Sequence, residues 1–563
     1  MSNELHPLIQ KILDARDVGD VEKFLSPDYT DLSDPSLLSD INLAVARILS
    51  AVAGGEDIMI YADYDADGIP GAVILKDFFD QVGYEKVTVY IPHRHDEGYG
   101  LHEHVIEQAA KDGVTLFITI DLGVTAIAQV ERANALGIDV IITDHHEPKA
   151  DVPKAFAIVN PKLGNYPDRM LCGAAVVFQL VRALIQKLRV KPADECLLPV
   201  HERVTQWPEG HSKWWLDLVG LSTISDMVPL VGENRILAHY GLHVFRKTRR
   251  PGIRALAKET RLSLRDTDEK DIGFSITPRI NAASRLSHAF DAFQVLAATD
   301  VKQAAEAARN LSRLNDQRKR VTANIMKQVR SMVRSRRPSP VVVIGHPEWN
   351  VGVLSIVAGK LCEELRKPVF VWTTHGPDKI KGSCRAPEGL SVLALMEGVP
   401  DAFSKFGGHQ AAGGYMTDHD HIHTLEQKLS EIFEALFSDW DPEVGRVSDP
   451  DVRTQMSEVD QLFYESLRRL APFGVGNPEP LFEFTDLRLT AVRTFGKHDD
   501  HLEVITTDTK GRQWKAVSFY TSIQKMSHTP SVGDPIRLLG KLEMNRFLGA
   551  NELRISLVDI LLA

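Results

Sequence analysis

The chain has 563 residues, of which 44% are hydrophobic and 25% charged, and its formal net charge is −11. These values are typical of a globular protein and exclude a disordered tail, a collagen and a low-complexity scaffold, while the length predicts three or four domains of roughly 150 residues. No leader pattern, no apolar run of roughly 20 residues and no C-x-x-C pair is found. We therefore expect a cytoplasmic protein without a disulfide framework or a zinc site.

A parallel α/β domain is predicted over residues 45–295, after a helical extension over residues 1–44. Short apolar runs alternate there with amphipathic segments, and the runs are IMIYA (58–62), KVTVYIP (86–92), TLFITI (115–120) and DVIIT (139–143). Continuous apolar strands joined by helices are typical of a parallel sheet that is covered on both faces. A further βα portion is expected to reach to about Asp226.

Acidic and imidazole side chains follow these apolar runs directly. They are Asp63, Asp65 and Asp67 in DYDADG, Asp121 after the third run, His145 and His146 behind Asp144, and Asp226 after a later apolar run. Because the carboxyl ends of parallel strands meet at one edge of a sheet, we expect these groups to converge. Packed carboxylates resist ionisation unless cations neutralise them. Such ligands suit Mn²⁺ or Mg²⁺, and two ions roughly 3.5–4 Å apart suit phosphoester hydrolysis.

Each of these motifs also has a simpler explanation. D-x-D-x-D-G opens an EF-hand loop, but the twelfth position here is Ile74 instead of a bidentate Glu. Asp121 alone is explained by a helix cap, and adjacent histidines are often a surface or packing pair. The occurrence of all four motifs at equivalent positions favours a metal site.

Three further parts are predicted along the rest of the chain. A connecting helix is expected within 296–337, where apolar residues recur every three or four positions and Pro338 ends the pattern. A second α/β domain over 338–435 should contain strands at 341–345 and 368–373 and a Gly-rich loop at 407–414. A linker over 436–480 then leads to five short alternating strands over 481–563, which are typical of an OB-type β-barrel.

Two stretches are basic although the whole chain is acidic. Residues 301–337 contain eleven Lys or Arg and two acids, and residues 239–265 contain eight and one. For the predicted helix, the alternatives are a solvated face and a wall of a nucleic-acid channel. On the barrel, Phe495 and Tyr520 are candidates for stacking bases. Some of the barrel aromatics should instead be core, Trp514 or Phe519 foremost.

The motifs around the acids resemble those of a known superfamily. DYDADG, the Asp121 segment, TDHH and SDMVPL resemble the four metal motifs of the DHH phosphoesterases. Further segments resemble signatures of the RecJ family, bacterial single-strand-specific 5′→3′ exonucleases, in the same order. They are PHRHDEGYGL (92–101), TPRINAASR (277–285), GSCR (382–385), FGGHQAAGG (406–414) and APFGVGNPEP (471–480).

The resemblance implies roles for the acids and histidines. Asp65 and Asp121 would hold one divalent ion, and Asp67, Asp121, His145 and Asp226 a second, with Mn²⁺ preferred over Mg²⁺. Asp63 would be a ligand or a neighbour of one, and His146 would face the scissile phosphate. Asp121, His146 and Asp63 are thus the predicted catalytic residues, with an activated water as the nucleophile.

The resemblance also implies a site for the 5′ phosphate and a function. Ser383, Arg385 and His409 of the second α/β domain, which is similar to DHHA1 modules, would bind the phosphate together with Arg279 and Arg94. The expected function is removal of 5′-mononucleotides from single-stranded DNA in repair and recombination. The alternatives are a phosphodiesterase for short oligonucleotides or cyclic dinucleotides, and a non-catalytic scaffold of a replication complex. Single-strand binding protein and a RecQ-type helicase are the expected partners of a monomer.

Overall fold

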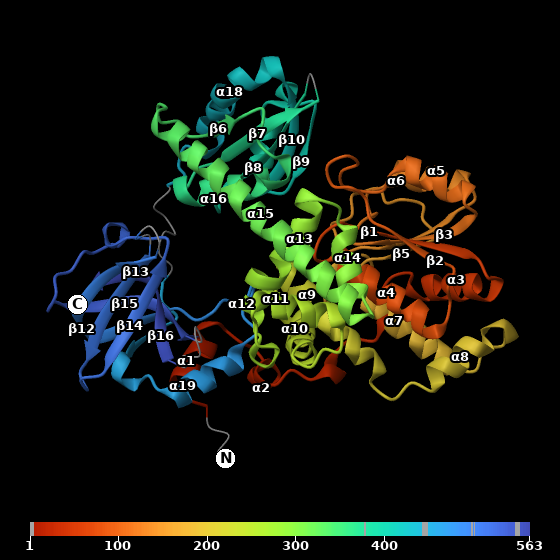
Figure 1. Ribbon diagram of the computed structural model, residues 1–563, viewed down its shortest axis with the longest axis horizontal. Helices are drawn as coiled ribbons and strands as arrows, with labels where there is room; N and C mark the ends of the chain where they lie inside the picture. Colours follow the sequence, from red (N-terminus) through yellow and green to blue (C-terminus); the bar gives the residue numbers. More distant parts are fainter. Residues whose placement is uncertain (1–4, 377–378, 442–448, 497–498, 500, 546–551) are drawn as a thin grey trace. The chain divides into compact units, whose positions relative to one another are not determined.

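The computed structural model describes residues 5–376, 379–441, 449–496, 499, 501–545 and 552–563. The chain divides into two compact units (Figure 1). The larger unit comprises Ser33–Asp226 and Tyr240–Arg446, and the smaller unit comprises Met1–Leu32, Met227–His239 and Val447–Ala563. In the described ranges, no single helix is long and apolar enough to cross a membrane.

The larger unit begins with a five-stranded parallel sheet in the order β2-β1-β3-β4-β5. Its strands are β1 (Asp57–Ala62), β2 (Val87–Tyr90), β3 (Val114–Ile120), β4 (Asp139–Thr143) and β5 (Ala157–Val159). The four apolar runs of the sequence are therefore strands, as predicted. Because β1 pairs with β2 on one side and β3 on the other, the strand order reverses at β1. A crevice forms beyond the carboxyl ends of the strands at such a point.

Helices cover both faces of this sheet (Figure 1). One face carries α5 (Glu103–Lys111) and α6 (Ile127–Ala135), whose Ile106 and Val130 pack in one apolar cluster with Phe117 of β3. The other face carries α3 (Ile41–Gly54), α4 (Gly68–Val82) and α7 (Gly173–Arg189). Burial on both faces explains why the strands are continuously apolar.

The rest of this domain is helical. Its main helices are α8 (Leu198–Thr205), α9 (Leu216–Ser225), α11 (Pro251–Thr260), α13 (Thr277–Leu286) and α14 (Phe290–Ala297). Asp226 was expected behind a further strand, but it caps the C-terminus of α9. The expectation was wrong because a short run that is buried on all sides is apolar throughout, whether it is a helix or a strand.

The helix α15 (Val301–Arg334) connects the two α/β domains of the larger unit. Its first half buries Ala304, Ala308 and Leu311, and it packs against α11, α13 and α14. Its second half buries Ile325 and Val329 in a cluster with α16 (Leu354–Leu365). The predicted helix is therefore confirmed, and one apolar stripe holds both domains.

The second domain has a mixed sheet in the order β6-β7-β8-β10-β9. Its strands are β6 (Val342–Gly345), β7 (Val369–His375), β8 (Lys379–Arg385), β9 (Lys405–Gly408) and β10 (Ala412–Asp418). The helix α16 covers one face, and α17 (Val392–Glu397) and α18 (His419–Phe437) cover the other. The expected Gly-rich loop at 407–414 is instead the tip of the β9–β10 hairpin. The glycines of β9 pair with those of β10, and the glycines of β10 also pair with β8.

The smaller unit contains the barrel. Its strands are β11 (Val452–Gln455), β12 (Phe482–Phe495), β13 (His501–Asp508), β14 (Gln513–Phe519), β15 (Pro535–Asn545) and β16 (Glu552–Leu562). The order is β11-β12-β13-β14-β16-β15, and an additional pairing of β12 with β15 closes the sheet. All five strands predicted after Pro480 are present.

Two boundaries differ from the sequence-based prediction. The expected linker 436–480 contains β11, which pairs with β12, and α19 (Gln461–Leu467), whose Phe463 is fully buried. The expected N-terminal extension contributes α1 (Pro7–Ala15), whose Ile9 and Ile12 lie in the same apolar cluster as the barrel strands. Both segments are parts of the barrel unit, because their apolar faces complete its core.

Candidate metal centre and phosphate-binding cluster

The loop after β1 holds its three aspartates in fixed positions. Oδ1 of Asp65 accepts hydrogen bonds from the backbone N of Asp67 (2.8 Å) and of Gly68 (3.2 Å). From α13, Oδ1 of Asn281 accepts the backbone N–H of Ala66 at 3.0 Å. A Cβ at Gly68 would lie 2.5 Å from the carbonyl oxygen of Asp63, so only glycine fits this turn.

Asp67 is bound by the N-terminus of α7. Its carboxylate accepts hydrogen bonds from the backbone N of Gly173 (2.5 Å) and of Ala174 (2.8 Å), and from the hydroxyl of Ser222 in α9. Free N–H groups and the helix dipole stabilise a negative charge at that end of a helix. The carboxylate is buried and held at one orientation beside the loop.

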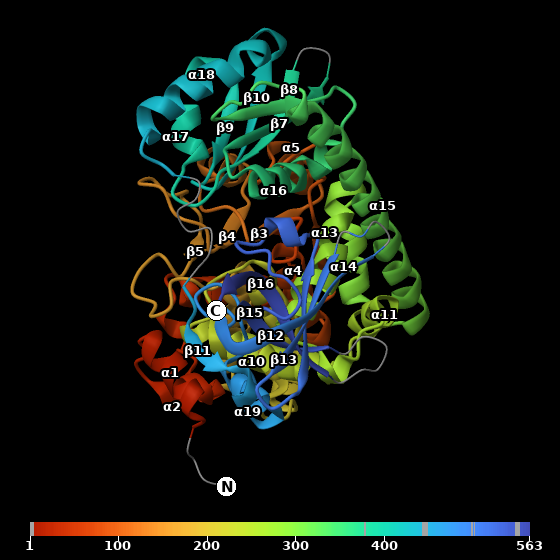
Figure 2. The same cartoon turned by 90° about the vertical axis from the view of Figure 1, so that its left-hand side faces the viewer.

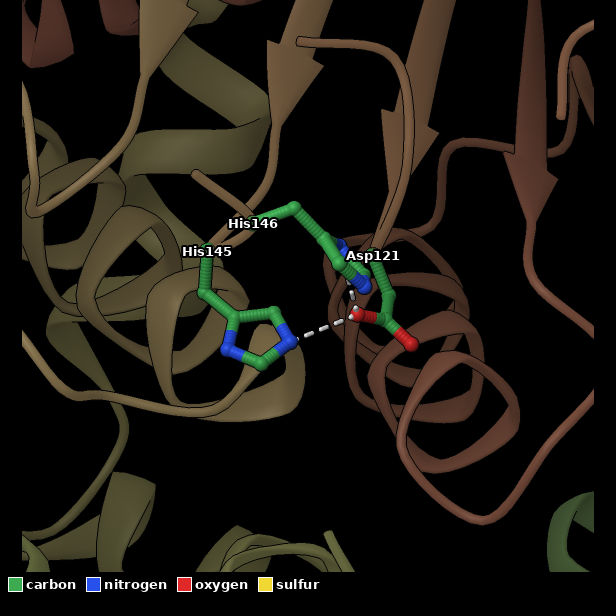
Figure 3. A group of neighbouring side chains, drawn as sticks. All are labelled: Asp121, His145 and His146. Atoms are coloured by element: carbon green, nitrogen blue, oxygen red, sulfur yellow. Dashed lines mark ion pairs between the residues drawn. The ribbon is translucent and has the colours of Figure 1, made fainter. Parts of the chain in front are cut away.

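Asp121 follows β3 in a left-handed backbone conformation with φ +62°. Aspartate tolerates this conformation better than most residues, and strain of this kind is common at functional sites. A Cβ at Gly173 would lie 2.7 Å from Cβ of Asp121, so glycine at the start of α7 leaves the space that the aspartate fills. The Asp121 carboxylate points toward both histidines (Figure 3). Its Oδ1 lies 3.1 Å from Nε2 of His145 and 3.8 Å from Nδ1 of His146.

His145 connects the acids from different elements. Its Nε2 lies 3.6 Å from Oδ2 of Asp67 and 3.7 Å from Oδ2 of Asp226. Three overlapping groups of side chains have ligand atoms within 4.8 Å of one another. They are Asp63–Asp65–Asp121, Asp67–His145–Asp226 and Asp121–His145–His146.

The electrostatics of the cluster fit divalent cations. Burial, and then the neighbouring carboxylates, raise the pKa of Asp63 and of Asp121 well above the ordinary value, and that of Asp226 to about 8. Oδ1 of Asp63 and Oδ1 of Asp121 are buried and accept no hydrogen bond of good geometry from any described residue; the 3.1 Å contact of Asp121 Oδ1 with Nε2 of His145 is an ion pair only if that imidazole is protonated. Buried oxygens without donors are costly, and a cation compensates for both the missing donors and the repulsion. The residues present therefore fit a metal centre.

Asp144 fixes His146. Oδ1 of Asp144 lies 2.8 Å from Nδ1 of His146 and accepts the backbone N–H groups of both histidines, while Oδ2 accepts that of Val124. Burial disfavours the charged imidazole, but the hydrogen bond and charge of Asp144 outweigh this effect and raise the pKa of His146 to about 9. Sequence reasoning assigned Asp144 no role, although it lies in the TDHH motif.

A group of cations that forms no ion pair with a described carboxylate lies beside the metal loop in the larger unit. Arg285 on α13 donates from Nη1 to the carbonyl oxygen of Gly352 (3.0 Å) and to Oγ of Ser355 (2.9 Å). Burial, and then the charges of Arg94, Arg318 and Arg385, lower its pKa to about 9. Arg94 also lies with its guanidinium 4.8 Å from the centroid of the Tyr64 ring, next to the metal loop. The positive charge of such a group is not balanced by an anion, and guanidinium groups are well suited to bind phosphate.

The predicted phosphate ligands fall into two sets. Ser383 and Arg385 share one face of β8, together with Lys381, and His409 lies in the β9–β10 turn that leads to Ala412, the strand partner of Arg385. Arg279, in contrast, donates to Oγ of Ser312 (3.1 Å) and to the carbonyl oxygen of Ser275 (2.6 Å). Sequence reasoning named Arg279 from TPRINAASR and did not name Arg285 in the same motif, and Arg318 lies within electrostatic reach of both.

The two predicted stacking residues lie together on the barrel. Rings of Phe495 and Tyr520 flank His501, with centroids 5.0 and 4.8 Å from its own. Tyr520 is 77% exposed and Phe519 52%, whereas Trp514 is buried and donates from Nε1 to Asp508. Of the two residues expected in the core, only Trp514 is there.

Comparisons with known proteins agree with this arrangement. Family models match the DHH family, N-terminal domain, over residues 57–200, the DHHA1 domain over 338–436 and the RecJ OB domain over 450–559. Together with the ligand cluster at the rim of a parallel sheet, these matches define a phosphoesterase of the DHH class.

Similarity over the whole chain shows which family within this class the chain belongs to. The single-stranded-DNA-specific exonuclease RecJ of Escherichia coli K12 is 32% identical over 99% of this chain and 96% of its own, and that of Haemophilus influenzae is 31% identical over 98% and 96%. The structure of RecJ in complex with Mn²⁺ from Thermus thermophilus matches with a TM-score of 0.76 and 26% identity, covering 99% of this chain and 78% of that one. The chain belongs to the RecJ family of single-stranded-DNA-specific exonucleases.

Proposed function

We propose that this protein removes 5′-mononucleotides from the 5′ end of single-stranded DNA, using two divalent cations, Mn²⁺ in preference to Mg²⁺. One observation carries the proposal: Asp121 and His145 each belong to two of the three overlapping ligand groups. Two neighbouring ions that share ligands require such an overlap. The names of the relatives and the Mn²⁺ complex of the Thermus protein support the same function.

We assign Asp65 and Asp121 to one ion, and Asp67, Asp121, His145 and Asp226 to the other, with Asp63 beside the first. Ions held there would supply Lewis acidity and lower the pKa of water. The donors on α7 and α9 keep the Asp67 carboxylate in place, and the α13 side chain of Asn281 keeps the metal loop in place. The chain thus orients its ligands before any substrate arrives.

His146 is proposed to stabilise negative charge on the scissile phosphate. Its Nδ1 is engaged by Asp144, which fixes the ring and favours its protonated form. Nε2–H of a protonated ring is then a second donor, and a preorganised charged donor is effective against charge that develops in a transition state.

The cations around Arg285 are proposed to bind the terminal 5′ phosphate. Arg94, Arg285 and Arg385 would bind it with Ser383 and His409, and the planar guanidinium groups suit two phosphate oxygens each. Binding of the terminal phosphate in one place, with the metals in another, would determine which phosphodiester bond is cut. This explains a 5′→3′ polarity.

The test of the function is product mapping on one single strand labelled separately at each end. With Mn²⁺, the 5′ label is expected to appear at once as a mononucleotide, while the 3′ label stays in shortening strands. Chelation with EDTA should stop both. Early release of the 3′ label, or cuts inside the strand, would overturn the proposal, and cleavage of dinucleotides alone would favour the small-substrate phosphodiesterase.

The role of the cationic cluster is tested with Arg285→Gln. Because hydrogen bonds to charged groups contribute about 1.5–3 kcal/mol, we expect a loss of roughly 10- to 100-fold in kcat/KM on 5′-phosphorylated strands, and much less on strands with a 5′ hydroxyl. Arg279→Gln is the matched control: both arginines donate to a serine hydroxyl and to a backbone carbonyl, so both variants lose the same kind of bond, and Arg285 is the one that lies next to the charges of Arg94 and Arg385. If Arg279→Gln shows the larger phosphate-specific loss, the assignment is reversed.

We also propose, from family membership alone, that the protein acts as a cytoplasmic monomer in DNA repair and recombination, with single-strand binding protein and a RecQ-type helicase as partners. Sedimentation of the purified protein, alone and with each partner, tests this. A stable dimer, or no complex with either partner, would contradict it.

A further inference from the structure

The helix α15 carries a stripe of cations on the face opposite to its buried one. Lys302, Arg309, Arg313, Arg320 and Lys327 are all exposed, and their spacing of seven, four, seven and seven residues places them on one side of the helix. The stripe spans 25 residues, or about 38 Å. We call these five residues the basic stripe.

These charges are not neutralised within the part of the chain that the structure describes. None of the five side chains lies within 4.0 Å of a carboxylate of a described residue, although Glu306 and Asp316 are on the same helix. Asp316 and Glu259 instead act on Arg279. Like charges along one helix repel one another, so an unpaired stripe of this length adds nothing to the stability of the helix.

The second basic stretch of the sequence lies next to this helix. The helix α11 packs along α15, and both are seen together at one edge of the larger unit in Figure 2. Arg254 and Lys258 of this stretch are exposed, and their spacing of four residues places them on one face of α11, while the exposed Arg261 caps the C-terminus of that helix. Arg250, from the same stretch, is largely buried and structural. The fold thus joins two basic segments that are distant in sequence.

We infer that the basic stripe of α15, together with the exposed cations of α11, binds single-stranded DNA beyond the nucleotides held at the metal centre. This inference rests on the proposed function. A row of unpaired cations about 38 Å long suits a flexible polyanion with regularly spaced phosphates. The role of the stripe is to keep a long strand bound between successive cuts. Long strands therefore gain affinity that short strands lack.

The test compares a stripe variant with a matched control on two substrate lengths. The stripe variant is Arg309→Gln, Arg313→Gln and Arg320→Gln, and the control is Lys187→Gln, Arg189→Gln and Lys191→Gln, which are exposed around the end of α7. Binding of a 30-nucleotide strand is measured against salt concentration with EDTA present, and hydrolysis of 30- and 4-nucleotide strands is measured with Mn²⁺. Circular dichroism checks that both variants fold.

The stripe variant should lose about 2 units from the slope of log K against log salt, since each contact to a single strand contributes roughly 0.7. Its KM for the 30-mer should rise severalfold relative to the control, with the KM for the tetranucleotide equal to that of the control. Equal slopes of log K against log salt for both variants would overturn the inference. That result is expected if the stripe binds an acidic protein segment instead of DNA. If the wild type degrades neither substrate, the proposed function itself fails.

Discussion

Asp121 is a proposed metal ligand, and it lowers the stability of the folded chain when no metal is bound. It combines a left-handed backbone, a buried oxygen that accepts no hydrogen bond of good geometry from the described residues, and the repulsion of the carboxylates of Asp67, Asp65 and Asp63. Each of these features destabilises the folded chain when no cation is bound. For the stability of the metal-free fold alone, a side chain that does not ionise would be better at this position.

Asp121→Asn should therefore abolish hydrolysis and stabilise the protein in EDTA. Removal of one negative charge relieves the repulsion, and a gain of about 1 kcal/mol corresponds to a rise of roughly 2–4 °C in Tm. Differential scanning fluorimetry with EDTA and with Mn²⁺ measures this, and Mn²⁺ should raise the Tm of the variant less than that of the wild type. A lower Tm in EDTA than for Asp151→Asn, an exposed control, would contradict the account.

Asp144 acts through His146 and not on substrate. It is buried, and its four hydrogen bonds fix the TDHH turn. Asp144→Asn keeps the shape but loses the charge that orients and protonates the imidazole. Loss of such an orienting partner typically costs 10- to 100-fold in activity, so we expect kcat to fall by about that factor with Mn²⁺ saturating. Unchanged kcat would show that His146 needs no charged partner.

Among the elements, the helices around the metal centre are held by one buried ionic group. Nη1 of Arg250 lies 2.6 Å from Oδ2 of Asp77 in α4, and its Nε lies 3.2 Å from Oδ1 of Asp217 in α9. Oγ1 of Thr248 donates to the other oxygen of Asp217 at 2.6 Å. Since Asp67 precedes α4 and Asp226 ends α9, this group fixes the distance between two proposed ligands.

Arg250→Met should consequently destabilise the larger unit by about 3–5 kcal/mol, because it leaves two buried carboxylates without their cation. Urea unfolding, followed by tryptophan fluorescence, measures the change. Arg249→Met is the matched control: Arg249 is exposed and lies over the ring of Trp214, so a loss below about 1 kcal/mol is expected. Equal losses for both variants would refute the ionic explanation.

On the scale of the whole molecule, the barrel unit is built from both ends of the chain. Leu8, Ile9, Ile12 and Leu13 of α1 lie in the same cluster as Phe463, Phe482 and Phe484. Arg16 reaches Asp451 at 2.9 Å and Asn477 at 3.1 Å. The amino-terminal segment is thus a structural part of a domain whose strands follow it only much later in the sequence.

Ile12→Ala should therefore weaken the barrel unit. Truncation of a fully buried isoleucine costs about 2–5 kcal/mol, and the loss should appear as an earlier unfolding step of the barrel in hydrogen exchange. The proposed metal ligands all lie in the larger unit, so hydrolysis of a tetranucleotide should be unchanged. An earlier unfolding of β1 and β3 in place of the barrel strands would contradict the assignment of α1.

The sequence by itself determined the parallel sheet, the connecting helix, the barrel strands and the side chains that gather at the proposed metal centre. Each of these features is local: a continuous apolar run predicts a buried strand, and an aspartate directly behind it lies at the sheet edge. The side chains therefore converge as predicted, with Asp226 arriving from a helix end because a short buried apolar run does not distinguish helix from strand.

Only the tertiary structure decided which arginine of TPRINAASR lies next to Arg94 and Arg385, and which core receives α1. Arg279 and Arg285 are six residues apart, so on a helix of 3.6 residues per turn they point about 120° apart, and only the packing of α13 shows which side faces Arg94 and Arg385. The amphipathic pattern of α1 likewise predicts a buried face but names no partner. Both choices depend on contacts between segments that are distant in sequence, and local periodicity contains no information about them.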